Sequence, residues 1–253
     1  FHTNPEALEA ELLAAIFDPE RKGSLRRIAD HLQHLAMLVR DRTANDLWRV
    51  LSTLNDPLTL PAGSPVLLAG DAIGILNQTI LGLASFHGLA RENMTRAQGW
   101  RFLDMGVRIE RCIYTATFLD CALRSAEADN PSVLESILDV VDNAITYRSR
   151  YNLLPNMAAV YDLVMLDDTN PRSILFQLNQ LVKHLERLPR EKQSALPSPA
   201  HRHLIECRAR VRLTDPRPLA SLARDWHLSQ VGETLQVVLG GIPRLSDAIA
   251  VSY

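Results

Sequence analysis

Apolar side chains recur every three or four residues along almost the whole chain, which is the spacing of one face of an α-helix. A typical stripe consists of Leu25, Ile28, Leu32 and Leu35. Few stretches alternate apolar and polar residues over the length of a strand, so the sequence predicts an all-α fold. We expect a multi-helix bundle of about ten to eleven helices that are mostly antiparallel neighbours. The predicted helices span residues 5–17, 24–41, 44–54, 65–90, 95–126, 131–150, 156–166, 171–188, 199–213, 217–226 and 229–251.

Residues that cap helix N-termini precede several of these stripes. A Ser, Thr or Asn side chain at this position accepts a hydrogen bond from a backbone amide that the helix leaves without a partner. Three of the caps are followed by proline, which suits the first helical position because its missing N–H group has no helical partner to lose. The predicted caps are Ser24, Thr43, Ser64, Thr95, Asn130 and Asn170.

The organisation of the chain indicates one domain over residues 1–253. Residues 189–200 hold three prolines and predict a linker, but the segment after them is too short to fold alone. The longest apolar stretch, residues 64–90, is interrupted by polar side chains and predicts a buried helix of a soluble protein, not a membrane span. The sequence starts at Phe1 without an initiator Met and its first residues show no signal-peptide pattern, so we expect the chain to begin inside a longer polypeptide, truncated at its N-terminus.

The net charge and the cysteine content limit the classes of partner and the cellular location that we expect for the chain. The net charge of −2 argues against binding to nucleic acid or to an anionic membrane, because both need a basic surface. The three cysteines show no paired spacing, so we expect no disulfide framework and a cytoplasmic location. Of the 27 Lys and Arg residues only three are lysines, and an arginine-rich site suits carboxylate or phosphate groups. A GC-rich genome would produce the same excess.

Motifs of known chemistry are absent from the sequence. It contains no glycine-rich phosphate loop and no metalloprotease or hydrolase signature. His31 and His34 have a spacing compatible with metal binding, but no third ligand follows, so we predict no metal site. The basic stretch 201–217 lacks interleaved aromatic residues and predicts a solvated or partner-facing helix.

The segment from Thr95 suggests a buried charge pair. On a helical wheel, Gly106, Glu110 and Ile113 fall on one face, opposite Arg108, and we expect that face to meet the core. A buried carboxylate must be paired or protonated. If residues 95–126 and 131–150 form an antiparallel hairpin, Glu110 faces Arg148, and we predict a salt bridge between them. The pair would either fix the helix register or line a pocket.

Three groups of motifs together resemble the alpha-E domain family, which is named for an all-helical fold with a Glu-Arg motif. The resemblance covers nearly the whole chain. Two departures stand out: family members usually open with a further helix that carries an earlier Glu-Arg motif, and Val107 stands where an arginine is common. The motifs are Phe86–Gly88, Glu92–Arg96, Gly99–Gly106 and Arg108–Arg111, then Thr146–Tyr151, then Asp167–Ser173 with Phe176 and Gln177.

What the resemblance implies about function is indirect. Alpha-E domains occur alone or fused to a circularly permuted ATP-grasp domain, often beside transglutaminase-like peptidases. An ATP-grasp domain activates carboxylates as acyl phosphates for attack by an amine. The resemblance therefore implies a peptide or carboxylate substrate, no cofactor in this chain, and ATP and Mg²⁺ only through the partner domain.

Three hypotheses remain open. In the first hypothesis, the chain is an accessory substrate-binding or scaffolding domain of an ATP-grasp amide or peptide ligase. In the second, it is an enzyme with Glu110 as general base and Tyr147 or Tyr151 as proton donor. Alternatively, it is a structural interaction module without a small-molecule site. The candidate catalytic residue is Glu110, and the candidate substrate-binding residues are Arg91, Glu92, Arg96, Arg108, Arg111, Tyr147, Arg148, Arg150, Tyr151, Asn170 and Arg172.

Overall fold

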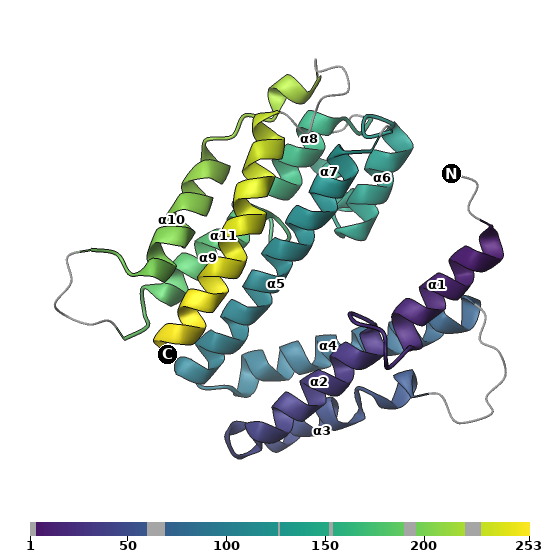
Figure 1. Cartoon of the computed structure of the whole chain (residues 1–253), viewed down its shortest axis with the longest axis vertical. Helices are drawn as coiled ribbons and strands as arrows, with labels where there is room; N and C mark the ends of the chain where they lie inside the picture. The colour runs from purple at the N-terminus through teal and green to yellow at the C-terminus, as the bar shows by residue number, and fades with distance from the viewer. Residues whose placement is uncertain (1–3, 60–68, 126, 152–153, 190–195, 221–228) are drawn as a thin grey trace. The chain divides into compact units, whose positions relative to one another are not determined.

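The computed structural model describes residues 4–59, 69–125, 127–151, 154–189, 196–220 and 229–253. All regular structure within these ranges is helical, which confirms the all-α prediction (Figure 1). The chain divides into two compact units, residues 1–96 and residues 97–253, and each is described here by itself. Both ends of the predicted linker 189–200 lie in the second unit, where they join two helices of the same core.

The first unit contains α1 (Pro5–Phe17), α2 (Leu25–Leu38), α3 (Asn45–Thr53) and α4 (Ala69–Asn93), with short 3₁₀ turns at Arg40–Arg42 and Asp56–Leu58. Helix α3 packs against α2 and α4, and α1 packs against the same two helices. Ser24 caps α2 as predicted, because its hydroxyl accepts a hydrogen bond from the Arg27 amide.

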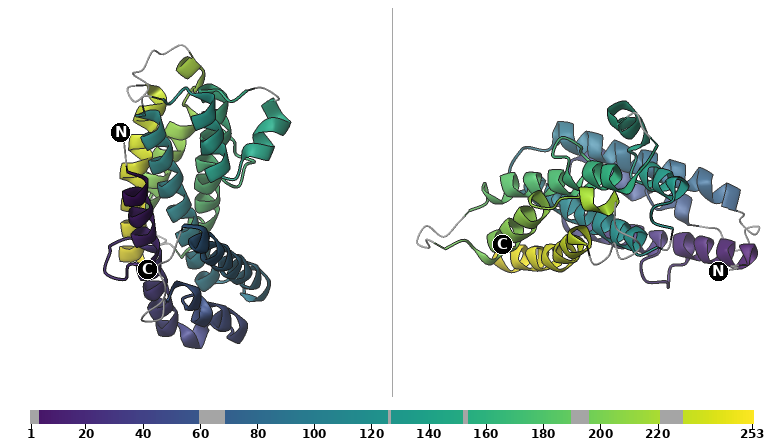
Figure 2. Two further views of the ribbon diagram at one scale, coloured as in Figure 1. Left: turned by 90° about the vertical axis from the view of Figure 1, so that its right-hand side faces the viewer. Right: turned by 90° about the horizontal axis from the view of Figure 1, so that it is seen from above.

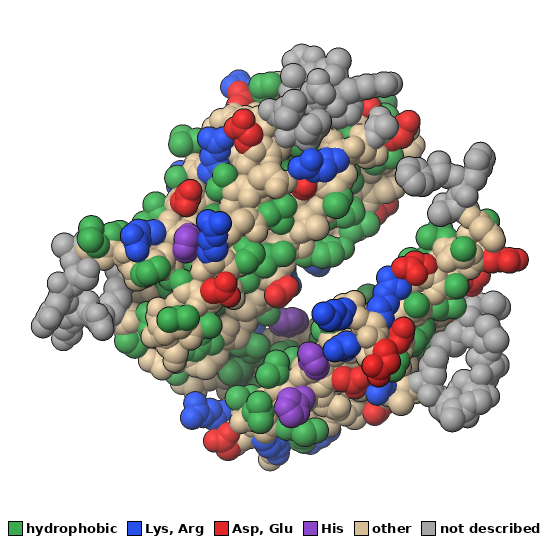
Figure 3. Space-filling view, viewed as in Figure 1, with side chains coloured by type: hydrophobic (Ala, Val, Ile, Leu, Met, Phe, Trp, Pro, Cys, Tyr) green, Lys and Arg blue, Asp and Glu red, His purple; other side chains and the backbone are tan. Residues whose placement is uncertain are grey.

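The described part of the long apolar stretch is not buried as expected. In α4, Ala72, Thr79 and Ala90 are buried, whereas Ile73 and Ile80 are exposed. The apolar residues surround the helix instead of forming one stripe, so the helices packed on one side cannot cover them all. By length and composition the segment Gly70–Asn93 could cross a membrane, and only 11% of its most apolar part is buried. Figure 3 shows hydrophobic side chains at the surface of both units, among charges of both signs.

The second unit is built on four long helices: α5 (Gln98–Leu123), α9 (Ile174–Leu185), α10 (Pro199–Arg212) and α11 (Gln230–Ser252). Each helix packs against two others, so that α5, α9, α10 and α11 close a ring (Figures 1 and 2). The enclosed core is one continuous apolar cluster. Its members in these helices include Met105, Ile109, Cys112, Ala116, Leu119, Leu178, Leu181, Leu185, Leu204, Cys207, Val211, Leu235, Val238, Ile242 and Leu245.

The predicted helix 131–150 is broken in two. The break separates α6 (Pro131–Val140) from α7 (Ala144–Tyr151) at Asp142, whose φ of 54° is left-handed. The Asn143 amide donates to the Leu138 carbonyl over 2.8 Å and the Asp142 amide donates to the Asp139 carbonyl, which is the hydrogen-bond pattern of a Schellman C-cap. Glycine usually marks this position, and the sequence offers an aspartate instead, so the break carried no obvious signal.

Other helix boundaries also differ from the predicted ones, for similar local reasons. The segment 156–166 consists of α8 (Met157–Tyr161) and a π-helical turn, η3 (Asp162–Leu166). Asn130 caps α6 as predicted, but the cap of α9 is Ser173 and not Asn170. Helices α3 and α5 begin after alanines, so Thr43 and Thr95 are not caps. The predicted cap Ser64 lies outside the described residues, and of the predicted helix 217–226 only a 3₁₀ turn, η4 (Arg217–Ala220), lies within them.

Candidate functional site

The face of α5 that meets the core is not the one expected. Met105, Ile109 and Cys112 are buried, and the same spacing continues through Ala116 and Leu119. Glu110 lies one position away, about 100° around the helix, and is exposed. The two possible stripes have the same spacing, and the buried one is the stripe with a large or sulfur-containing apolar side chain at most positions. The prediction that Glu110 faces the core was therefore wrong.

The predicted Glu110–Arg148 salt bridge is absent as well. Neither residue belongs to any ion pair within 4.0 Å among the described residues. The reason is topological, because α5 packs against α9 and α11, while the helix that carries Arg148 packs against α6. An exposed Glu110 also lacks the desolvated surroundings that favour a general base in a pocket.

A polar network does connect α5 with α9, on the flank of the core stripe. The Asp104 carboxylate accepts hydrogen bonds from Arg108, at 3.1 and 3.2 Å, and lies 2.6 Å from Nε2 of the buried His184. Arg108 donates its remaining terminal nitrogen to the Gln177 side chain over 3.0 Å. Gln177 in turn donates to the Pro171 carbonyl, just before α9 begins. The network therefore fixes the position of the Arg108 guanidinium.

The surroundings of Asp104 favour its charged form. Burial alone would raise the pKa of the carboxyl, but the hydrogen bonds from His184 and Arg108 outweigh burial and lower the pKa to about 2. On the other side of the His184 ring, Nδ1 is buried without a hydrogen-bond partner among the described residues. The carboxylate and the guanidinium thus form a charged pair that also holds the imidazole.

Arg111 is the cation of the Glu-Arg dipeptide on α5 and is half-buried. Burial lowers the pKa of its guanidinium, and the charges of Arg108 and Arg172 lower it further, so the three guanidinium groups lie in one neighbourhood. Arg111 makes no hydrogen bond or ion pair with any described residue. Arg172 pairs with the exposed Asp142 over 3.2 Å. We call Arg108, Arg111 and Arg172 the arginine cluster.

The loop before α9 gathers the other two signature motifs into internal contacts. Arg150 of α7 forms an ion pair with Asp167, and Tyr151 donates to Asp162. Burial raises the pKa of the Tyr151 phenol, and its hydrogen bond to Asp162 raises the pKa further. The buried Asn170 amide donates to the Asn143 side chain over 2.9 Å. Arg150, Tyr151 and Asn170, all predicted to bind substrate, are thus engaged within the protein.

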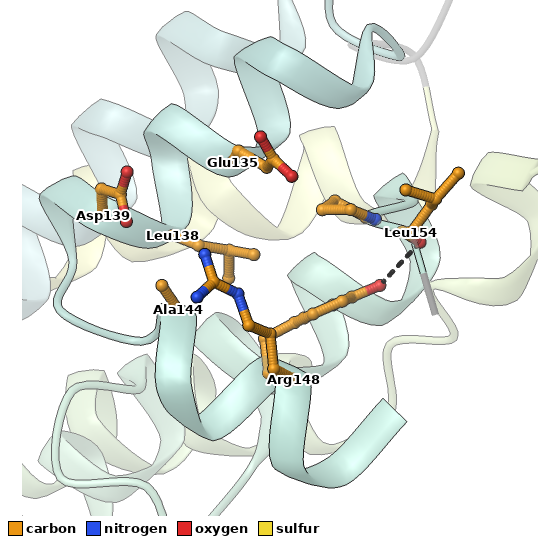
Figure 4. Close-up of a pocket in the computed structure, with 8 residues that line it drawn as sticks. Glu135, Leu138, Asp139, Ala144, Arg148 and Leu154 are labelled. Carbon is orange, nitrogen blue, oxygen red and sulfur yellow. Dashed lines mark hydrogen bonds between the residues drawn. The ribbon is translucent and has the colours of Figure 1, made fainter. Parts of the chain in front are cut away.

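Tyr147 and Arg148 line a pocket of about 370 Å³ between α6 and α7 (Figure 4). The Tyr147 ring is buried, and its hydroxyl donates to the Leu154 carbonyl over 3.3 Å and accepts from the Asn156 amide. The Arg148 side chain extends from α7 towards α6. The lining residues are Glu135, Leu138, Asp139, Ala144, Tyr147, Arg148, Leu154 and Pro155.

Three of the predicted binding residues belong to the first unit. Arg91 and Glu92 are exposed near the end of α4. Arg96 turns back and donates to the backbone carbonyls of Arg91 and Met94, so it satisfies carbonyls at the end of that helix. The contacts of Arg96 with backbone give it a local structural role.

The described residues contain no group of three or more His, Cys, Asp or Glu side chains that could hold a metal ion. Two of the thiols lie in the bundle core. Burial raises the pKa of the Cys207 thiol to about 11 and raises that of Cys112 as well, so both stay protonated.

His184 is the residue of this region that sequence reasoning missed. Asp104 and Arg108 have the i,i+4 spacing of a helical ion pair and could be paired from the sequence. His184 reaches Asp104 from a helix 80 positions further along the chain, and no local pattern marks that contact.

Comparisons with known proteins agree with the helical architecture. A family model described as a predicted alpha-helical domain with a conserved ER motif matches residues 1–253. The chain is 30% identical over 237 residues to the uncharacterized protein Rv2567 of Mycobacterium tuberculosis, and the match covers 92% of this chain and 26% of that protein. The uncharacterized protein Mb2597 of Mycobacterium bovis matches with the same identity and coverage. The chain thus spans about a quarter of the length of these curated relatives, and no solved structure matches it.

Proposed function

Because the chain belongs to the alpha-E family of helical domains, we propose that it is an accessory domain that binds carboxylate or phosphate groups for an ATP-grasp amide or peptide ligase. The observation that carries this proposal is Arg111, a half-buried guanidinium beside two others that forms no ion pair with any residue the structure describes. Guanidinium groups stay protonated in proteins. Arg108 and Arg172 are paired with Asp104 and Asp142, so within the arginine cluster an added anion would neutralise mainly the charge of Arg111.

The geometry of the arginine cluster suits an oxyanion. Arg108 is held by Asp104 and Gln177, so little side-chain entropy is lost when it meets a ligand. Among the described residues, the carboxylate that favours the charged form of Arg111 is Asp104, which Arg108 and His184 already share. A phosphate or carboxylate would supply the missing negative charge through charge-assisted hydrogen bonds.

The length of the relatives supports the proposed accessory role. Proteins several times longer than this chain have room for a catalytic domain beside it. In this proposal ATP and Mg²⁺ bind to a circularly permuted ATP-grasp partner, fused or separate, and a transglutaminase-like peptidase is a further candidate partner. The helical chain itself contributes substrate binding and no cofactor.

Phosphate titration of the isolated chain tests the anion site. Calorimetry with inorganic phosphate and with acetate should detect binding to the wild type, and Arg111→Gln should weaken it at least about tenfold, as expected for loss of a charge-assisted contact. Arg187→Gln is a matched control, since Glu186 and Arg187 repeat the same dipeptide at an exposed position. Equal affinity in all three proteins would contradict the anion site.

Co-expression with an ATP-grasp domain tests the accessory role separately. If that role is correct, the two chains should elute together in size-exclusion chromatography, and Arg111→Gln should leave the complex intact while it lowers ATP-dependent amide formation. Separate elution at micromolar concentration would exclude a stable complex.

A second candidate function, a structural interaction module, is favoured by the internal contacts of the signature motifs. Arg150 of α7 pairs with Asp167, and Asn143, just before α7, accepts a hydrogen bond from Asn170, so both contacts link this region to the loop before α9. Under this alternative the motifs maintain the fold alone. Arg111→Met should then raise stability, because it removes repulsion from Arg108 and Arg172, and anions should not bind.

A further inference from the structure

The pocket between α6 and α7 carries charges of both signs on an apolar base. Glu135 and Asp139 lie one turn apart on α6, and Arg148 reaches towards them from α7 (Figure 4). All three side chains are exposed, and none of them forms an ion pair within 4.0 Å among the described residues. Side chains of opposite charge therefore line the pocket without an ion pair across it.

We propose that this pocket binds a small α-amino acid or the amino end of a short peptide. Side chains one helical turn apart have Cβ atoms about 5–6 Å from each other, so two carboxylates can hold one ammonium group between them. An ammonium has three donors and no acceptor, which matches this pair. The Arg148 fork meets the carboxylate or carbonyl of the same ligand.

The apolar lining and the volume fit a ligand of that size. Leu138, Ala144 and Pro155 provide surface for an aliphatic side chain, and Leu154 is an exposed apolar residue at the edge. A volume of about 370 Å³ lies at the lower end of small-molecule sites. Tyr147 contributes its ring only, because its hydroxyl is engaged with backbone groups.

Two other ligand classes fit less well. A divalent cation prefers six or more oxygen ligands, whereas this pocket supplies two carboxylates and a guanidinium that repels metal. A simple anion would meet two carboxylates against one guanidinium. A zwitterion satisfies both signs at once, so charge complementarity favours it over either ion.

This inference does not rest on the proposed function, because no residue of the pocket belongs to the arginine cluster. The two sites can therefore be tested independently. If both are correct, the domain holds an amine and an oxyanion, which are the two kinds of group that amide formation joins.

Titrations followed by the amide NMR spectrum of the ¹⁵N-labelled chain test the pocket. The probes are L-leucine, L-leucinamide, which lacks the carboxylate, and 4-methylpentanoate, which lacks the ammonium. At millimolar concentrations leucine should shift the amides of Leu138 and Ala144 most strongly, leucinamide less, and 4-methylpentanoate least. Shifts that are equal for leucine and 4-methylpentanoate, or no shifts at all, would overturn the proposal.

Substitutions assign each end of the ligand. Glu135→Gln with Asp139→Asn should weaken the binding of leucine and of leucinamide at least fivefold. Arg148→Gln should weaken the binding of leucine more than that of leucinamide, because the carboxylate loses a charge-assisted contact and the carbonyl only a neutral one. Because these side chains are exposed, the folded spectrum should persist, and each single acidic variant provides a milder test. Arg187→Gln is the control, since this exposed residue belongs to neither site and should leave leucine binding unchanged. Leucine binding that survives the acidic double variant would contradict the proposed pocket.

Discussion

Asp104 shows how one side chain can join two helices through charge. It receives two hydrogen bonds from Arg108 on its own helix and faces His184 on α9. Its pKa of about 2 is lower than that of an aspartate in an unfolded chain, near 3.9. The charged form is therefore bound more tightly in the folded state, and its contribution to the free energy of unfolding is present above about pH 4 and lost as the pH falls towards 2.

We expect Asp104→Asn to remove this acid dependence. The difference in unfolding free energy between wild type and variant should shrink by roughly 2 kcal/mol between pH 4 and pH 2. Urea unfolding followed by circular dichroism at several pH values measures that difference. Arg108→Gln removes one of the two partners and should reduce the loss in part. A difference that stays constant over this range would show that the fold does not favour the carboxylate.

Arg111 and Arg108 differ at this scale although they lie one turn apart. Arg108 is engaged by Asp104 and Gln177, whereas Arg111 makes no hydrogen bond or ion pair with a described residue, and the repulsion from Arg108 and Arg172 exceeds the attraction from Asp104. The sequence marks both as arginines of one helix face. Only the three-dimensional contacts distinguish the restrained guanidinium from the unpaired one.

At the level of helices, the packing of α10 on α11 depends on one glycine. A Cβ atom added to Gly241 would overlap Sγ of the buried Cys207, whereas one added to Gly240 would meet nothing within 4 Å. Both glycines lie in the same helix, and alanine is the better helix former at each. Any difference between their substitutions therefore reports the contact with α10.

We expect Gly241→Ala to lower the free energy of unfolding by about 1–3 kcal/mol, because the added methyl group overpacks the core. Gly240→Ala should instead stabilise the protein by about 0.5–1 kcal/mol through helix propensity. Thermal and urea unfolding compare the two variants. Cys207→Ala should recover part of the loss in the Gly241→Ala background, and strict additivity of the two changes would argue against the contact.

The positions of the helices can be predicted well from the sequence, whereas the side of each helix that faces the core is predicted less well. Caps such as Ser24 and Asn130 act within four residues, so a local pattern identifies them. The break at Asp142 depends on a left-handed residue that is not glycine. The face of α5 was misassigned because stripes through Ile109 and through Glu110 have the same spacing, and only the helices packed against α5 select between them.

The candidate site was predictable in its composition but not in its connections. Arg108, Arg111 and Arg172 were singled out from motifs, and the structure brings them into one neighbourhood. Tyr147 and Arg148 line a pocket, yet the acidic residues that line it with them, Glu135 and Asp139, come from a helix whose register the sequence does not set. Contacts across the bundle, such as His184 with Asp104, depend on topology and leave no local signal.

At the scale of the whole chain, the second unit has its own apolar core. The continuous cluster of buried residues belongs entirely to residues 97–253. The described buried apolar residues of the first unit are fewer and lie outside this cluster; they include Leu47, Leu51 and Leu58. The two units therefore differ in how much apolar surface each buries within itself.

We expect residues 97–253, expressed alone, to fold cooperatively into a helical bundle, because the apolar side chains at the centre of this unit are buried by its own helices. Circular dichroism and the dispersion of amide NMR signals measure this directly. The companion segment 1–96 should unfold at a lower temperature. A non-cooperative thermal transition of 97–253 would show that the bundle needs the first unit, and the chain would then be a single folding domain.

The different exposure of the three cysteines allows thiol labelling to measure how often the helices of the second unit separate. Cys112 and Cys207 lie in the core of the second unit as buried thiols, and Cys121, on α5 as well, is exposed. A thiol reagent therefore marks Cys121 immediately and the two inner thiols only in molecules whose helices have separated. The ratio of slow to fast labelling reports how often the ring of helices opens under native conditions, without denaturant or an added probe.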